Sequence, residues 1–234
     1  MDRLTRKELK KDKFALEVGH TVEFLEVHRK LFIRYGAIAL AVVVLLVGWF
    51  YYNRSQGAAR QKELRAAMTL METPVGPSPA PGATTFSSAE EKNKAVTAAL
   101  SDLATKRSGS DEGLVAQYYL GTAAADQGRM DEAVRRLTTV ADSGSRDYAS
   151  LAKLVLSQIY AGQGKTAEAE KLLRGLIDKP TLLVTKEEAT IALGRLLTPT
   201  RPEEARKMLD PLQKVPGPVG RAAVLALTEM PIKK

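Results

Sequence analysis

The sequence predicts an all-α protein, with one membrane-spanning helix near the N-terminus and a solenoid of helix-turn-helix repeats after it. Two observations carry this prediction. An uncharged apolar stretch runs from residue 35 to residue 52, and a short motif recurs at a fixed spacing of 36 residues in the C-terminal half. The 234 residues are enough for one modest folded domain beside such a helix.

The composition narrows the classes of function. The formal net charge is +8, but Lys and Arg alternate with Asp and Glu, which is typical of solvated helix faces rather than of a nucleic-acid-binding surface. The chain contains no cysteine, which excludes disulfides, thiolate metal sites and cysteine nucleophiles. Both histidines, His20 and His28, precede the apolar stretch, so no Ser-His-Asp set can form after it. We therefore expect no enzymatic activity, no cofactor, no metal site, no nucleic-acid partner and no small-molecule substrate.

Residues 1–30 are expected to form a cytoplasmic amphipathic segment. Phe14, Val18, Val22 and Leu25 recur at spacings of three and four, which places them on one helix face. Such a helix either lies on the membrane surface or docks on another membrane protein. Nine Lys or Arg residues in positions 1–34 against four in positions 53–72 favour a cytoplasmic N-terminus and a large domain outside the cytoplasm. Near the helix the contrast is smaller, with five in positions 11–34 against the same four.

Residues 31–52 are expected to form a transmembrane helix. Aromatic residues stand at both ends of the stretch, and about 20 helical residues cross a hydrocarbon core. One alternative is a buried core helix, but core helices of this length rarely lack polar residues. Another is a cleaved signal peptide with a weak cleavage site at residues 57–59, but the apolar run is long and 30 residues precede it. We favour an uncleaved anchor.

The next segments lead from the anchor to the repeats. Residues 53–72 are rich in strong helix formers and predict a stalk helix, which can simply continue the membrane helix. Residues 73–87 are rich in Pro and Gly and predict a flexible linker. Ser88 followed by Glu91 is a capping-box pattern that predicts a helix from there to about Lys106, with the stalk helix as its partner.

A repeat dominates residues 111–216, within a repeat domain that we place at 88–234. A Glu-Ala pair recurs with its alanines at Ala133, Ala169 and Ala205, and each alanine is followed by apolar residues at +4 and +7. That spacing describes one buried helix face, on which the small alanine lets a neighbouring helix approach closely.

Each copy has an upstream partner helix. Leu120-Gly121 precedes the first alanine, Leu156-Ser157 takes the matching place in the second copy, and Leu193-Gly194 recurs in the third. Gly128 and Gly164 mark the turns, whereas prolines in the third copy are expected to shorten the turn by one residue. Residues 221–229 predict a short helix that covers the last repeat, as the ends of solenoids require. This is the pattern of the tetratricopeptide repeat, and a generic helical bundle is the alternative.

Two motifs in the repeats resemble catalytic sites without their context. Residues 162–166, Gly-Gln-Gly-Lys-Thr, end like a phosphate-binding loop, but no strand precedes them and the first glycine of the motif is missing. Glu132, Glu168 and Glu204 recur at one repeat position, which predicts helix-surface residues rather than an acid-base pair.

The remaining candidate is a binding groove, because the first helix of each tetratricopeptide pair lines a concave surface. By position, the groove candidates are Val115, Tyr118, Thr122 and Asp126 in the first copy, Leu151, Leu154 and Gln158 in the second, and Glu188, Ile191 and Arg195 in the third. This set mixes apolar and polar groups and lacks the Lys/Arg cluster that would clamp a carboxylate or phosphate, so an extended peptide segment fits it best. The alternative for each residue is packing between repeats.

The short N-terminal tail, the membrane helix that ends Gly-Trp-Phe-Tyr-Tyr and the small repeat domain together resemble a bacterial family, the ancillary Sec-translocon subunits (YfgM-like). The tail is longer here, and the Pro-rich insertion interrupts the stalk. The resemblance implies a single-pass inner-membrane protein whose periplasmic repeats contact translocon subunits, translocating chains or periplasmic chaperones. It implies no catalytic residues.

Two functional hypotheses follow from these observations. The first is a membrane-anchored adaptor that binds protein or peptide partners and links protein export to periplasmic chaperones. The second is a structural or assembly subunit of another large inner-membrane complex, with the repeats buried against a fixed partner. An open groove favours the adaptor, and a groove filled by a neighbour or by the terminal segment favours the subunit.

Overall fold

The computed structural model describes residues 29–77 and 84–230 of the chain. It divides into two compact units, Met1–Ala59 and Arg60–Lys234. The predicted N-terminal amphipathic segment, apart from its last two residues, lies outside the described residues.

The first unit contains most of a long apolar helix. Helix α2 spans Arg29–Glu72, so the predicted membrane helix and the predicted stalk belong to one continuous helix. Its 19-residue window Ile33–Tyr51 has a mean hydropathy of 2.1, and none of that window is buried. By length and composition this helix can cross a membrane, as an anchor or a signal sequence does.

The Pro-rich segment is more ordered at its described ends than its composition predicts. Val75 and Phe86 form an isolated parallel bridge, in which Gly76 N donates to Phe86 O at 2.9 Å and Phe86 N to Pro74 O at 3.0 Å. Helix α3, Ala89–Lys106, then begins where the capping pattern predicts, and Glu91 N donates to the Ser88 hydroxyl at 3.1 Å.

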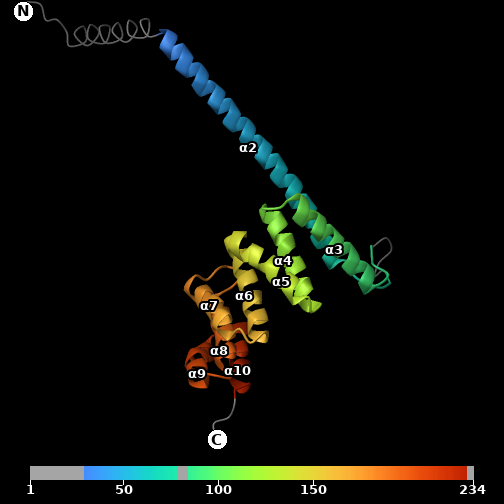
Figure 1. Ribbon diagram of the computed structural model, residues 1–234, viewed down its shortest axis with the longest axis vertical. Coiled ribbons are helices and arrows are strands. Elements are labelled where there is room, and N and C mark those ends of the chain that lie inside the picture. The colour runs from blue at the N-terminus through green and yellow to red at the C-terminus, as the bar shows by residue number, and fades with distance from the viewer. Residues whose placement is uncertain (1–28, 78–83, 231–234) are drawn as a thin grey trace, which may run out of the picture. The chain divides into compact units, whose positions relative to one another are not determined.

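Three helix pairs follow and stack in chain order (Figure 1). They are α4 (Asp111–Asp126) with α5 (Met130–Ser143), α6 (Arg146–Gly162) with α7 (Thr166–Asp178), and α8 (Lys186–Leu197) with α9 (Pro202–Leu209). A short 3-10 helix η1 (Asp210–Lys214) and helix α10 (Pro218–Thr228) end the described chain. The all-α repeat architecture predicted from the 36-residue spacing is therefore confirmed.

The motif alanines are fully buried between helices. Ala133, Ala169 and Ala205 are each 0% exposed, and the apolar residues four positions later are buried with them. The preceding glycines explain the Leu-Gly signal. A Cβ atom on Gly121 or Gly194 would lie 2.8 Å from Cγ of Leu137 or Leu209, respectively, so in the first and third pairs the first helix sits against the second without room for a side chain. In the second pair the buried Ser157 occupies the matching position.

The turns follow the glycine pattern in the first two pairs only. Gly128 and Gly164 have φ angles of 75° and 74°, a left-handed conformation that glycine adopts without strain. In the third pair the expectation of a shorter turn is wrong. Residues 198–201 connect the helices, against 127–129 and 163–165 in the earlier pairs. Helix α8 ends three residues after Gly194, whereas α4 ends five residues after Gly121. The third copy is therefore one residue shorter because its first helix is shorter, although its turn is longer.

Both ends of the repeat stack are covered by further helices. Leu64, Ala67 and Met68 from the end of α2 share one hydrophobic cluster with α3 and α4, the place that the sequence predicted for the stalk. Ala223 and Ala226 of α10 belong to the cluster formed by α8 and α9, so this helix packs on the last repeat. The apolar faces of the repeats are thereby closed at both ends of the stack.

Candidate protein-binding groove

A pocket of about 460 Å³ lies between α4 and α6, the first helices of two neighbouring repeats. Helix α4 contributes Thr122, Ala125 and Asp126, and α6 contributes Val155, Gln158, Ile159 and Gly162. Met130, the first residue of α5, and Gln163, the first residue of the turn after α6, complete the lining. The spacings of three and four within each helix place these residues on the two facing surfaces.

The chemistry of the pocket suits a neutral, extended polypeptide. Gln158 and Gln163 each carry an amide that can both donate and accept, as a peptide backbone requires of its partner. Val155 and Ile159 supply apolar surface beside them, and Asp126 is the one charged residue in the lining. The pocket therefore offers hydrogen bonds and apolar contacts but no cationic clamp.

A cluster of three tyrosines extends the same surface. Tyr118 and Tyr119 of α4 have ring centroids 5.3 Å apart, and the Tyr118 ring lies edge-to-face against Tyr148 of α6 at 5.7 Å. Tyr118 precedes Thr122 by one helical turn, so the cluster continues the face that lines the pocket. Desolvation by burial, followed by the neighbouring Tyr119, raises the pKa of Tyr148 to about 12, and the same two causes raise the pKa of Tyr118. Tyr118 and Tyr148 are therefore neutral at physiological pH.

The pocket brings together three of the ten residues predicted for the groove, namely Thr122, Asp126 and Gln158. Tyr118 lies on the same face of α4, half-buried among the tyrosines. The assignment of all ten residues to partner binding stays a prediction.

The other predicted groove residues lie elsewhere in the stack. Val115, Leu154 and Ile191 are 7%, 9% and 5% exposed, which is the packing alternative considered for each of them. Leu151 is half-buried against the C-terminal cluster. Glu188 and Arg195 are exposed on α8, where Arg195 Nε lies 3.6 Å from the Glu229 carboxylate that follows the cap helix. The third repeat thus contributes nothing to this pocket.

Sequence reasoning missed several residues of the lining. Val155 lies three positions before Gln158, so the three- and four-residue spacing of a helix face predicts that both side chains lie on the same surface. Met130 and Gln163 lie at the interhelical turns, and their place in the pocket depends on how two repeats stack. A local sequence pattern does not predict how two repeats stack.

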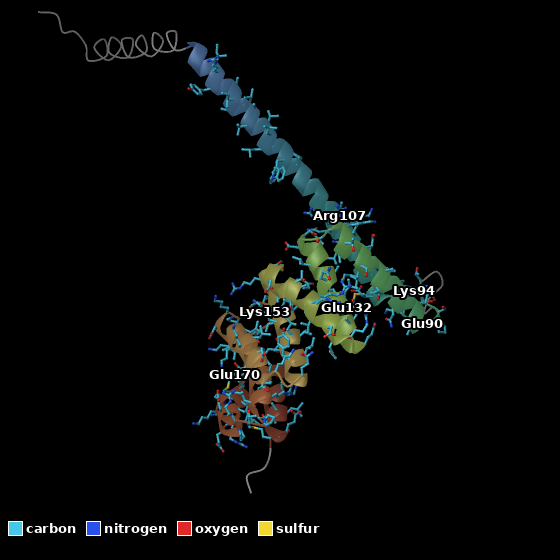
Figure 2. The ribbon with its side chains drawn as sticks, viewed as in Figure 1. Glu90, Lys94, Arg107, Glu132, Lys153 and Glu170 are labelled. Carbon is cyan, nitrogen blue, oxygen red and sulfur yellow. The ribbon has the colours of Figure 1, made fainter. Side chains whose placement is uncertain are left out.

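The motifs that resemble catalytic sites have structural roles in the repeats. The Lys165 ammonium lies 5.6 Å from the centroid of the Tyr160 ring, at the turn between α6 and α7. Glu132 on α5, labelled in Figure 2, pairs with Arg136 at 2.8 Å. Within residues 29–77 and 84–230, no group of three His, Cys, Asp or Glu side chains is arranged to hold a metal ion.

Comparison with known proteins agrees with this architecture. The family model described as a tetratricopeptide repeat-like domain matches residues 30–182, more than half of the 234-residue chain. The matched range begins with the apolar helix and ends in the loop after α7, so the third repeat and its cap lie beyond it. No curated protein and no solved structure is significantly similar to the chain.

Proposed function

Because the chain belongs to the tetratricopeptide repeat-like family, we propose that it is a membrane-anchored adaptor whose groove between α4 and α6 binds extended segments of partner proteins. In this proposal α2 is an uncleaved anchor with the N-terminus in the cytoplasm and the repeats in the periplasm. The chain itself performs no chemistry.

The observation that carries the proposal is the unfilled volume of about 460 Å³ between α4 and α6, with two amides at its edge and apolar side chains beside them. An extended peptide makes no hydrogen bonds within its own backbone, and amide side chains can pair with its free N–H and C=O groups. The adjoining tyrosines add broad, rigid contact area at a small cost in conformational entropy. The cap helix α10 packs on α8, α9 and η1, so it covers the last repeat rather than this groove.

Two features of the sequence support the proposed localisation. The excess of Lys and Arg before the apolar helix favours a cytoplasmic N-terminus. The resemblance to ancillary Sec-translocon subunits favours translocating chains, translocon subunits and periplasmic chaperones as the partners. We therefore place the adaptor at the site of protein export in a bacterial inner membrane.

One observation favours the alternative of a fixed structural or assembly subunit. Val224 and Leu225 on the cap helix α10 are 45% and 54% exposed. Adjacent exposed apolar residues at the end of a solenoid can be covered by a permanent neighbour. In that case the groove would be a secondary feature, and a single partner would occupy the repeats at a constant ratio.

Photocrosslinking in cells separates the two functions. A photoreactive amino acid replaces Gln158 in the groove, and a matched variant carries it at Thr138, an exposed position on α5 outside the pocket. The adaptor predicts many adducts from position 158, with exported chains and chaperones, and few from position 138. One stoichiometric partner at both positions would indicate the fixed subunit. Equal, low yields at both would refute a binding role for the groove.

A further inference from the structure

A second pocket, of about 420 Å³, lies on the opposite side of α6 from the groove. Its α6 residues include Arg146 and Lys153, whereas the groove takes Val155 and Ile159 from the same helix. At about 100° per residue, the two sets of side chains point in directions about 180° apart. The rest of this pocket comes from α7 and from the loop that follows it. It is therefore a separate surface.

Four cations surround this second pocket. Arg146 and Lys153 come from α6, Lys171 from α7 and Lys179 from the position after it, and the lining contains one carboxylate, Asp178. Within the described residues none of the four cations forms an ion pair.

The neighbouring arginine on the same helix behaves differently. Arg174, also on α7, bonds to Glu170 at 2.7 Å and to Glu204 at 2.8 Å. Glu170 and Lys153 are both labelled in Figure 2. Arg174 is thus neutralised by two carboxylates, whereas the cations around the pocket have no carboxylate partner among the described residues. Arg146 donates to the Pro180 carbonyl at 3.0 Å. The lysines around the pocket can therefore pair with an external anion.

The floor of the pocket is apolar, and a rigid loop beside it exposes two leucines. Ala149 and Leu176 are buried beneath the cations. The Thr181 hydroxyl bonds to Ser150 on α6 at 2.7 Å, and Val184 is 0% exposed in the core, so both ends of the turn are held in place. Between these anchors Leu182 is 85% exposed and Leu183 is 42% exposed.

We propose that this cationic pocket and the leucine loop next to it form a second docking surface, which binds an acidic segment of a partner protein whose carboxylates alternate with apolar side chains. The carboxylates pair with Lys153 and Lys171, and the apolar side chains contact the floor and Leu182. No aromatic side chain lines the pocket, so nucleic-acid bases have no stacking partner there. The surface does not depend on the groove of the proposed function.

The test uses the full chain in nanodiscs of neutral phosphatidylcholine. The probe is a fluorescent 12-residue peptide in which Glu and Leu alternate, and a second peptide carries Gln in place of Glu. Binding is followed by fluorescence anisotropy. The variant Lys153→Glu/Lys171→Glu is compared with Lys62→Glu/Lys94→Glu, which changes two exposed lysines on α2 and α3 outside both pockets and has the same net charge.

We expect the Lys153/Lys171 variant to bind the acidic peptide about tenfold more weakly than the parent, because two attractive charges become repulsive. The Lys62/Lys94 variant should remain within about twofold, since its charges lie outside the pocket. Leu182→Ser should weaken binding about threefold to fivefold by removing apolar contact. The Gln peptide should bind weakly to every form. Circular dichroism verifies that each variant keeps its helices.

Three results would overturn the inference. The first is equal affinity of the parent and the Lys153/Lys171 variant, or no binding to the parent at about 1 mM peptide. The second is loss of peptide binding in Gln158→Glu instead, which would place the acidic segment in the groove and leave the proposed function standing. The third is binding of phosphatidylserine vesicles that requires Lys153 and Lys171 while the peptide does not bind, which would make the surface a lipid contact.

Discussion

Replacing Gly194 by alanine adds one methyl group at the closest contact between α8 and α9. The new Cβ atom would lie 2.8 Å, 2.9 Å and 3.0 Å from Cγ, Cδ2 and Cδ1 of Leu209, which is 0% exposed. Non-bonded carbon atoms prefer separations of about 3.5–4.0 Å. Gly175 in α7 is a matched control, because a Cβ atom there would meet nothing within 4 Å.

The expected magnitude is the balance of two opposing effects. Overpacking a well-filled contact costs about 1–3 kcal/mol. Alanine in place of glycine inside a helix contributes about 1 kcal/mol in the other direction. We therefore expect Gly194→Ala to lower the free energy of unfolding by up to about 2 kcal/mol. Gly175→Ala should raise it by about 0.5–1 kcal/mol, since only the helix-propensity effect remains.

Urea unfolding of the full chain in neutral micelles, followed by far-ultraviolet circular dichroism, measures both changes. The single tryptophan, Trp49, lies in the apolar helix, so its fluorescence does not report on the repeats. In a double-mutant cycle, Leu209→Ala should cost about 1–2 kcal/mol less in the Gly194→Ala background, because the methyl group then has room. Equal stabilisation by Gly194→Ala and Gly175→Ala would refute the close approach.

The remaining predictions concern burial and charge in the repeats. Ala169→Glu should cost more than about 3 kcal/mol, because it forces a carboxylate into a contact that is 0% exposed, and urea unfolding of the exposed-site control Ala167→Glu should match the parent. Arg201 and then Arg174 hold the pKa of Glu170 below 4.5, so Glu170→Gln should cost about 1 kcal/mol at pH 7. That difference should vanish as pH falls below 4.5 through the lowered pKa in the folded protein, and a pH-independent difference would contradict the pairing. The pKa of Tyr148 is raised from 10 to about 12, so its contribution to stability should be lost as pH rises through this window, and Tyr148→Phe should show a smaller alkaline loss in thermal melts.

Much of the repeat architecture was predictable because each repeat is a local unit. The alanine and the two apolar residues after it lie within two helical turns, and the helical period alone places them on one face. Ala133 and Ala205 are buried as that argument requires. The same argument failed for the third turn, because two prolines were assigned to the turn alone. Pro202 in fact begins α9, a position where its fixed φ and missing N–H are tolerated.

The groove was predictable only in part. Thr122, Asp126 and Gln158, chosen by their position within the repeat, line the pocket between α4 and α6. The same criterion also selected Leu154 and Ile191, which are buried. Neighbouring positions on one helix can face either the groove or the contact with the next helix. That distinction depends on the angle at which neighbouring repeats pack, which is set by contacts between distant side chains.

By itself the sequence determined the helical fold class, the apolar helix and the register of the repeats, because each depends on residues within a few turns of one another. Only the tertiary structure decided which side chains share a pocket. Arg146, Lys153, Lys171 and Lys179 are 33 residues apart at their extremes, and in the sequence they are ordinary charges on helix surfaces. They become one cationic surface because the packing of α6 on α7 and the Ser150–Thr181 hydrogen bond bring them around the same cavity.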